Sequence, residues 1–106
     1  MKIDVPITDH FGKVMAVVKG TIVDVAPHLP MVTWALVDVR QFAPYVYVRW
    51  NITNLETGSS YADLSGRTKA ECIRNATEFL ANISSAKMTR ALNKRHARRN
   101  HMREST

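Results

Sequence analysis

The sequence predicts an α+β fold: an antiparallel sheet of about four strands packed on one amphipathic helix, in a βββα-like order, with a basic C-terminal helical arm. Three observations lead to this prediction. Residues 1–63 are rich in Val, Ile, Thr, Trp and Tyr and are divided by turn residues, a pattern typical of short strands. From Thr68 to the end there is no glycine or proline. The last 23 residues carry the whole net charge of +6.

The expected strands follow one another through the first 64 residues. They are Lys2–Ile7, Lys13–Ala26, Met31–Arg40, Tyr45–Thr53 and a short run near Ser60–Leu64. Gly20 interrupts the second run, which predicts either a bulge or a bend between two shorter strands. Pro27 and Pro30 end that run, because proline cannot donate to a strand ladder.

The run Tyr45–Thr53 has the clearest alternation of side chains. One face is apolar and is expected to face the core: Val46, Val48, Trp50 and Ile52. The other face is amphipathic: Tyr45, Tyr47, Arg49, Asn51 and Thr53. Because a single helix covers only one face of a sheet, this second face is expected to lie open, or else to be covered by the N-terminal strand or by a second subunit.

A helix is expected to begin at Thr68. Thr68 and Glu71 have the spacing of a capping box. Apolar residues then recur at steps of three and four: Cys72, Ile73, Ala76, Phe79, Leu80 and Ile83. This spacing predicts an amphipathic helix of roughly four turns, which is expected to pack on the apolar face of the Tyr45–Thr53 strand.

A second helix is expected over Ala86–Arg103, after a break at Ser84-Ser85. The chain therefore divides into a body, residues 1–83, and a basic arm, residues 84–106. The body has equal numbers of acidic and basic residues, whereas the arm has seven basic residues and one acidic residue. We expect the first two turns of the arm to dock through Met88 and Leu92 and the rest to project or fray, since like charges repel.

The arm is the principal candidate binding site. Its basic residues are Lys87, Arg90, Lys94, Arg95, Arg98, Arg99 and Arg103. Arginine suits phosphate because its planar fork donates paired hydrogen bonds and stays charged. The expected partner is nucleic acid, DNA or RNA, with an acidic protein surface as the first alternative and a solvated tail that only keeps the protein soluble as the second. A membrane is not expected, because the basic helix lacks an opposing apolar face.

The amphipathic strand face is the second candidate. Tyr45, Tyr47 and Arg49 project together there and are suited to stacking on unpaired bases. The same residues are equally suited to contact with a protein. The protein contact includes a homodimer formed edge to edge or face to face.

Metal binding, cofactors and catalysis have little support in the sequence. The four histidines are widely separated and no cysteine pair exists, so no metal set is expected. Cys72 lies in the apolar stripe, where a buried, inert thiol is expected. Asp24, Asp38 and His28 form an acid/base set only if the fold brings them together.

The sequence therefore predicts a small non-enzymatic nucleic-acid-binding protein, a regulator or accessory factor that contacts phosphates through its basic helix. The alternative is a protein-interaction module, an inhibitor or adaptor, that docks through its sheet face or tail. One cysteine and an N-terminus without a signal-peptide core favour a cytoplasmic location.

Overall fold

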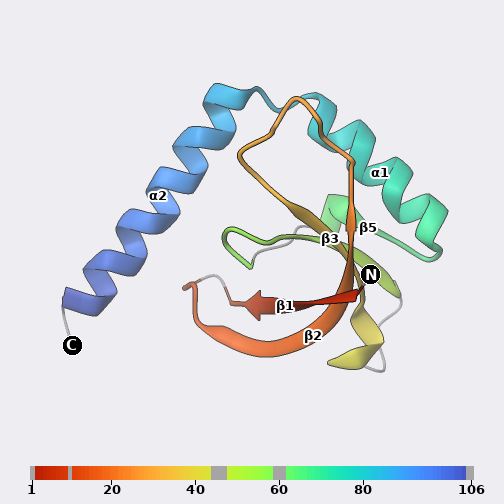
Figure 1. Ribbon diagram of the computed structural model, residues 1–106, viewed down its shortest axis with the longest axis horizontal. Coiled ribbons are helices and arrows are strands. Elements are labelled where there is room, and N and C mark those ends of the chain that lie inside the picture. Colours follow the sequence, from red (N-terminus) through yellow and green to blue (C-terminus); the bar gives the residue numbers. More distant parts are fainter. Residues whose placement is uncertain (1, 10, 44–47, 59–61, 105–106) are drawn as a thin grey trace.

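A five-stranded antiparallel sheet is followed by two helices in the computed structural model, which describes residues 2–9, 11–43, 48–58 and 62–104 (Figure 1). The strands pair in chain order: β1 (Lys2–Thr8), β2 (Val14–Val23), β3 (Trp34–Asp38), β4 (Trp50–Asn54) and β5 (Ser65–Gly66). The helices are α1 (Lys69–Ala81) and α2 (Ser85–Glu104), and two 3-10 turns are η1 (Val39–Gln41) and η2 (Ala62–Leu64). The predicted α+β class is confirmed.

β2 is one continuous, strongly curved strand (Figure 1). The bulge or break expected at Gly20 is therefore wrong, and the register of the β1–β2 pair shifts between Ile7 and Thr8 instead. Gly20 instead allows two neighbouring strands to pack closely against β2. A Cβ atom there would lie 2.8 Å from Cγ2 of Val5 and 3.0 Å from the carbonyl oxygen of Leu36, so the curve needs a residue without a side chain.

Three strands end earlier or begin later than expected. β3 stops at Asp38, where the chain turns into η1. Because β3 is the neighbour of β4, the β4 ladder also begins opposite Asp38, at Trp50. The strand expected from residue 45 is therefore wrong over Val48 and Arg49, and its first residues, 45–47, lie outside the described residues. Most of the run expected near 60–64 is also not a strand, since η2 occupies its end and β5 follows at Ser65.

α1 packs on one face of the sheet as expected. Cys72, Ala76 and Leu80 are buried against Ile52 of β4, and Trp50 packs beside them. The exception is Ile73, which is exposed although it lies in the apolar period. The Thr68 side chain caps the helix by accepting from the Glu71 N–H (3.1 Å).

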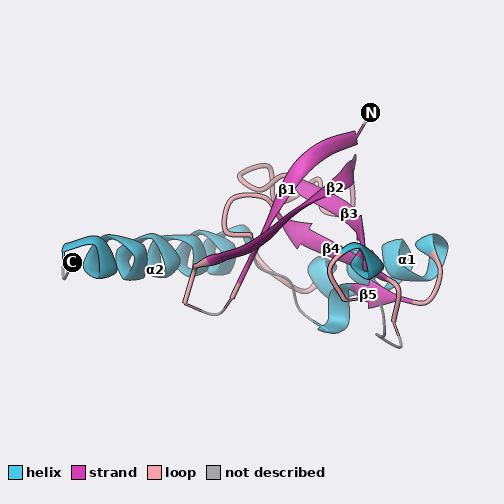
Figure 2. Ribbon diagram, turned by 90° about the horizontal axis from the view of Figure 1, so that it is seen from below, coloured by secondary structure: helices cyan, strands magenta, loops and turns pink. Residues whose placement is uncertain are grey.

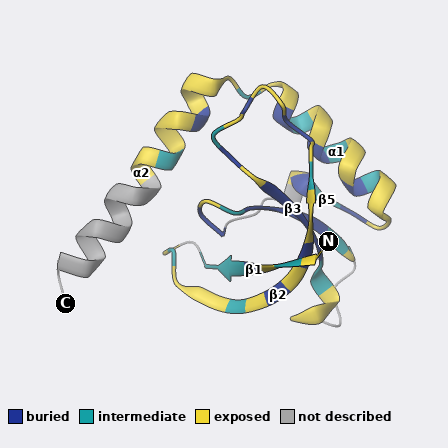
Figure 3. Ribbon diagram, in the orientation of Figure 1, coloured by how far each residue is buried: buried dark blue, intermediate teal, exposed yellow. Residues whose placement is uncertain are grey.

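The second face of the sheet is not open, so the first expectation is wrong, and the alternative of cover by the N-terminal strand is confirmed. The curved β1–β2 hairpin folds over it and buries a second core made of Val5, Val18, Ala35 and Val37 (Figure 3). Asn51 and Thr53, expected on an amphipathic face, are buried as well.

A closing contact holds the end of β1 against the turn that follows β4. The Thr8 N–H donates to the carbonyl oxygen of Gly58 (3.0 Å), and the Thr8 hydroxyl donates to the carbonyl oxygen of Thr57 (3.0 Å). Gly58 has φ +72°, and a Cβ atom there would lie 2.9 Å from the carbonyl oxygen of Pro6. Glycine is therefore the residue that this turn requires.

The junction between α1 and α2 rests on the loop between β2 and β3. Nε2 of His28 lies 2.9 Å from the Leu80 carbonyl oxygen and 3.1 Å from that of Ile83, so the imidazole ring ties the β2–β3 loop to the end of α1 and to the residues that follow it. Met88 is buried and Leu92 half-buried against the same core. The predicted docking of the first two turns of α2 is thus confirmed.

Cys72 is an inert thiol in this packing. It is fully buried, its Sγ donates to the carbonyl oxygen of Leu64 (3.3 Å), and burial, with a smaller contribution from the charge of Glu71, raises the pKa of the thiol to about 11. We expect Ellman's reagent at about pH 8 to label Cys72 no faster than the protein unfolds, because the thiolate is the reactive form. In denaturant the labelling should be immediate.

The matched control for this measurement is Ala86→Cys, which adds a thiol at an exposed position of α2. That variant should take up one equivalent at once and its second only on unfolding. Labelling of the parent protein at the rate of the added thiol would contradict the buried position of Cys72.

Candidate nucleic-acid interface

The first half of α2 has one docked side and one basic side. Lys87, Arg90 and Lys94 are exposed, whereas Met88 and Leu92 contact the core. At 3.6 residues per turn, the three bases lie on the side of the helix opposite the two docked residues, with their centre roughly 210° around the helix axis. The basic side therefore points away from the body.

The second half of α2 continues the helix away from the sheet. Figure 2 shows α2 projecting to one side of the molecule. With 20 residues, α2 is about 30 Å long, and the two docked residues hold only its beginning. The remaining predicted bases lie on this described stretch of backbone, although their side chains fall outside the described part: Arg95, Arg98, Arg99 and Arg103.

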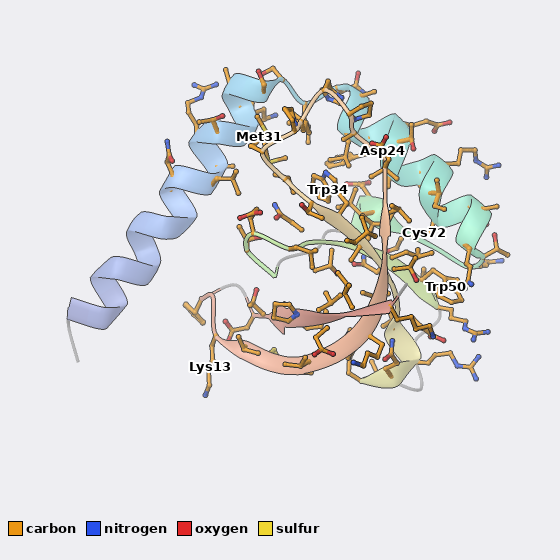
Figure 4. All side chains as sticks on the ribbon, viewed as in Figure 1. Lys13, Asp24, Met31, Trp34, Trp50 and Cys72 are labelled. Atoms are coloured by element: carbon orange, nitrogen blue, oxygen red, sulfur yellow. The ribbon has the colours of Figure 1, made fainter. Side chains whose placement is uncertain are left out.

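A second basic cluster surrounds Trp50, at the opposite end of α1 (Figure 4). The Arg49 guanidinium and the Lys69 ammonium each lie 5.0 Å from the centre of the Trp50 ring, a favourable cation–π distance. A hollow of about 370 Å³ adjoins them and is also lined by Lys2 and Lys19. Sequence reasoning missed this cluster, because its members come from separate segments of the chain and none of them forms a motif.

Acidic residues neutralise part of the Trp50 cluster. Lys19 pairs with Asp4 (2.5 Å) and Arg49 pairs with Asp38 (2.9 Å). Among the described residues, Lys2 and Lys69 have no such ion pair. The hollow therefore keeps a positive charge, but one much smaller than that of the arm.

The Asp38 carboxylate binds two neighbouring residues at this end of the sheet. Its Oδ2 accepts from Nε and Nη2 of Arg49 (3.1 and 2.9 Å), and its Oδ1 accepts from the Arg40 N–H (3.0 Å). Burial alone would raise the pKa of the Asp38 carboxyl, but these hydrogen bonds and the charges of Arg49 and Arg40 together lower it. Arg49 is thereby held in place by one carboxylate and one aromatic ring.

Of the predicted stacking face, only Arg49 lies within the described residues. Arg49 lies before β4 rather than within it, and it is bound to Asp38. Tyr45 and Tyr47 lie outside the described residues. The predicted arm bases lie on one continuous element, α2.

In the described part of the chain His28 and Asp38, two members of the suggested acid/base set, are not brought together. His28 contacts the C-terminal end of α1. Asp38 lines the same hollow as Lys69, the first residue of α1. The two ends of this 13-residue helix are about 20 Å apart. Within the described residues, no three His, Cys, Asp or Glu side chains are grouped so that they could hold a metal ion. No helix in the same residues is both long and apolar enough to cross a membrane.

The Asp38–Arg49 pair predicts a pH-dependent contribution to stability. Because the pKa of Asp38 is below its ordinary value of 3.8 in the folded protein, the pair stabilises the fold above that value and loses its effect as the pH falls through the lowered pKa. We expect Arg49→Gln to raise the pKa of Asp38, measured by carboxyl NMR titration. The loss of unfolding free energy in this variant should be present at neutral pH and should shrink in acid.

Arg74→Gln is the control, because Arg74 is an exposed base on α1 that makes no contact with Asp38. It should leave the Asp38 titration unchanged. An unchanged titration in Arg49→Gln as well would show that Arg49 does not set the pKa of Asp38.

Comparison with known proteins adds no further assignment: no protein-family model matches this chain, and neither the curated proteins nor the solved structures contain a significant match to it.

Proposed function

We propose that this protein binds nucleic acid, DNA or RNA, through α2 and acts without catalysis as a small regulator or accessory factor. The observation that carries the proposal is the two-sided start of α2. Met88 and Leu92 attach the helix to the body, while Lys87, Arg90 and Lys94 point into solvent on the far side. A helix that used its charges only to keep the protein in solution would not need a fixed point of attachment.

The dimensions and chemistry of the arm suit a phosphate-lined groove. A helix with its side chains is about 10–12 Å wide, and the major groove of B-form DNA is about 12 Å wide. Arginine-rich segments also bind distorted grooves and loops of RNA. Five of the seven arm bases are arginine, which favours paired hydrogen bonds to phosphate over diffuse attraction.

The proposal predicts a strong salt dependence that resides in the arm. If five to seven phosphates are neutralised, the log–log slope on duplex DNA is about −4 to −6. We expect the triple variant Lys87→Gln, Arg90→Gln, Lys94→Gln to have a slope that is shallower by about 2 to 3 units. Fluorescence anisotropy with single- and double-stranded DNA and RNA, at about 50 and 200 mM salt, measures this change.

A second variant, truncated after Lys94, removes the other four arm bases and keeps both docked residues. The salt slope of this variant should be shallower still than that of the triple variant. The body should keep its thermal unfolding transition. This design is preferable to deleting the whole arm, because loss of Met88 would expose the core under the α1–α2 junction.

The matched control removes three exposed bases from the body: Lys13→Gln, Arg40→Gln and Arg74→Gln. It has the same net charge as the arm triple and should keep nearly the parental slope. Equal losses in the two triples would mean that net charge alone governs binding. Absence of nucleic-acid binding by the parent at low salt would overturn the proposal in favour of an acidic protein surface as the partner.

A further inference from the structure

β2 is paired along one edge but only partly along the other. Its partner β1 covers residues 14–21, whereas its partner β3 covers only Gly20–Val23. Over Val14–Val18 the second edge of β2 has no neighbouring strand among the described residues. Figure 2 looks onto this edge, and no other ribbon lies in front of the first half of β2.

Gln41 marks where the open edge begins. Its side-chain amide acts as a substitute strand: the Lys19 N–H donates to Oε1 of Gln41 (3.0 Å), and Nε2 of Gln41 donates to the Lys19 carbonyl oxygen (2.8 Å). Main-chain groups in a strand alternate in direction. Val17 therefore presents its N–H and carbonyl groups on the same side as Lys19, with no partner in the described structure, and the alternation ends at Met15, where the register of the β1–β2 pair shifts.

The side chains along this edge are apolar and exposed. Met15 is 70% exposed and Val17 63% exposed, and no charged residue occurs between Val14 and Val18. Proteins protect free edges with lysine, proline or inward-pointing charge. β1, the outermost strand, has such protection in Lys2, Asp4 and Pro6, whereas the open part of β2 has none.

We propose that two copies of this chain pair through the open edge of β2 as an antiparallel, two-fold symmetric strand pair centred on Ala16. In this register Met15 lies opposite Val17 of the second copy, and Val17 lies opposite Met15 of the second copy. In these two pairs the free N–H and carbonyl groups of Val17 in each copy face the other strand, and the exposed side chains of Met15 and Val17 form one continuous apolar strip. The segment is thus complementary to itself, which is why the occupant is a second copy.

The ends of the segment agree with this register. Lys13 would lie opposite Lys19 of the second copy. These like charges repel little, because the charge of Lys19 is already paired with Asp4. Lys13 points away from the body at the tip of the β1–β2 hairpin (Figure 4). The described residues of each copy contain one such unprotected edge, so the two-fold pairing closes as a dimer and does not extend into a fibre.

The test is the mass of the full chain, measured by sedimentation from low to high micromolar concentration. The parent is expected to be a dimer, and Val17→Lys should weaken dimerisation about a hundredfold, because the added charge occurs twice in a symmetric contact. Ile22→Lys is the matched control: Ile22 is also on β2 and 55% exposed, but β3 already covers that part of the strand. It should remain dimeric, with thermal unfolding as the check of folding for both.

Cross-linking tests the register. Residues facing each other in a non-hydrogen-bonded antiparallel pair have Cα atoms about 4.5 Å apart, which a disulfide can span. Ala16→Cys should form a disulfide-linked dimer on oxidation, whereas Thr21→Cys, at a site paired on both sides, should not. A monomeric parent throughout the concentration range, or a dimer unaffected by Val17→Lys, would overturn the proposal, whatever the protein does with nucleic acid.

Discussion

The packing of α1 on the sheet is the contact on which the rest of the structure depends. Cys72, Ala76 and Leu80 are fully buried on it, and a large buried apolar side chain stabilises a fold by about 1.5–3 kcal/mol. The close fit requires Gly66 in β5, because a Cβ atom there would meet the backbone nitrogen of Cys72. The position of α1 then sets both basic regions: its first residue, Lys69, lies beside Trp50, and its end directs α2 away from the body.

The curvature of β2 is the second constraint, and it has two opposite consequences. By curving, the strand brings β1 across the face of the sheet that α1 leaves bare, and it encloses Val5, Val18 and Val37. The same curve separates the first half of β2 from β3, whose pairing ends at Gly20. Within the residues that the structure describes, a sheet that covers its own second face in this way leaves part of one strand without a neighbouring strand, and Gln41 satisfies only the first free position.

Features that depend on residues close together in the chain could be predicted. The Thr68 cap, the break before α2 and the docking of Met88 and Leu92 all follow from spacing within one helix or its ends. The arm bases could likewise be named, since they lie on one element. The Trp50 cluster could not be predicted, because Lys2, Lys19, Arg49 and Lys69 belong to segments that only the folded sheet brings together.

The sequence by itself determined the class of the fold, the apolar stripe of α1 and the confinement of positive charge to the last helix, because each depends on composition or on a local period. Only the tertiary structure decided where β4 begins, what covers the second face and which edge stays free. A strand ends where its neighbouring strand ends, as the pairing of Trp50 with Asp38 shows. Whether a face of the sheet is buried depends on which segment packs against that face. Alternation shows that a face is apolar, but it carries no information about the segment that packs there.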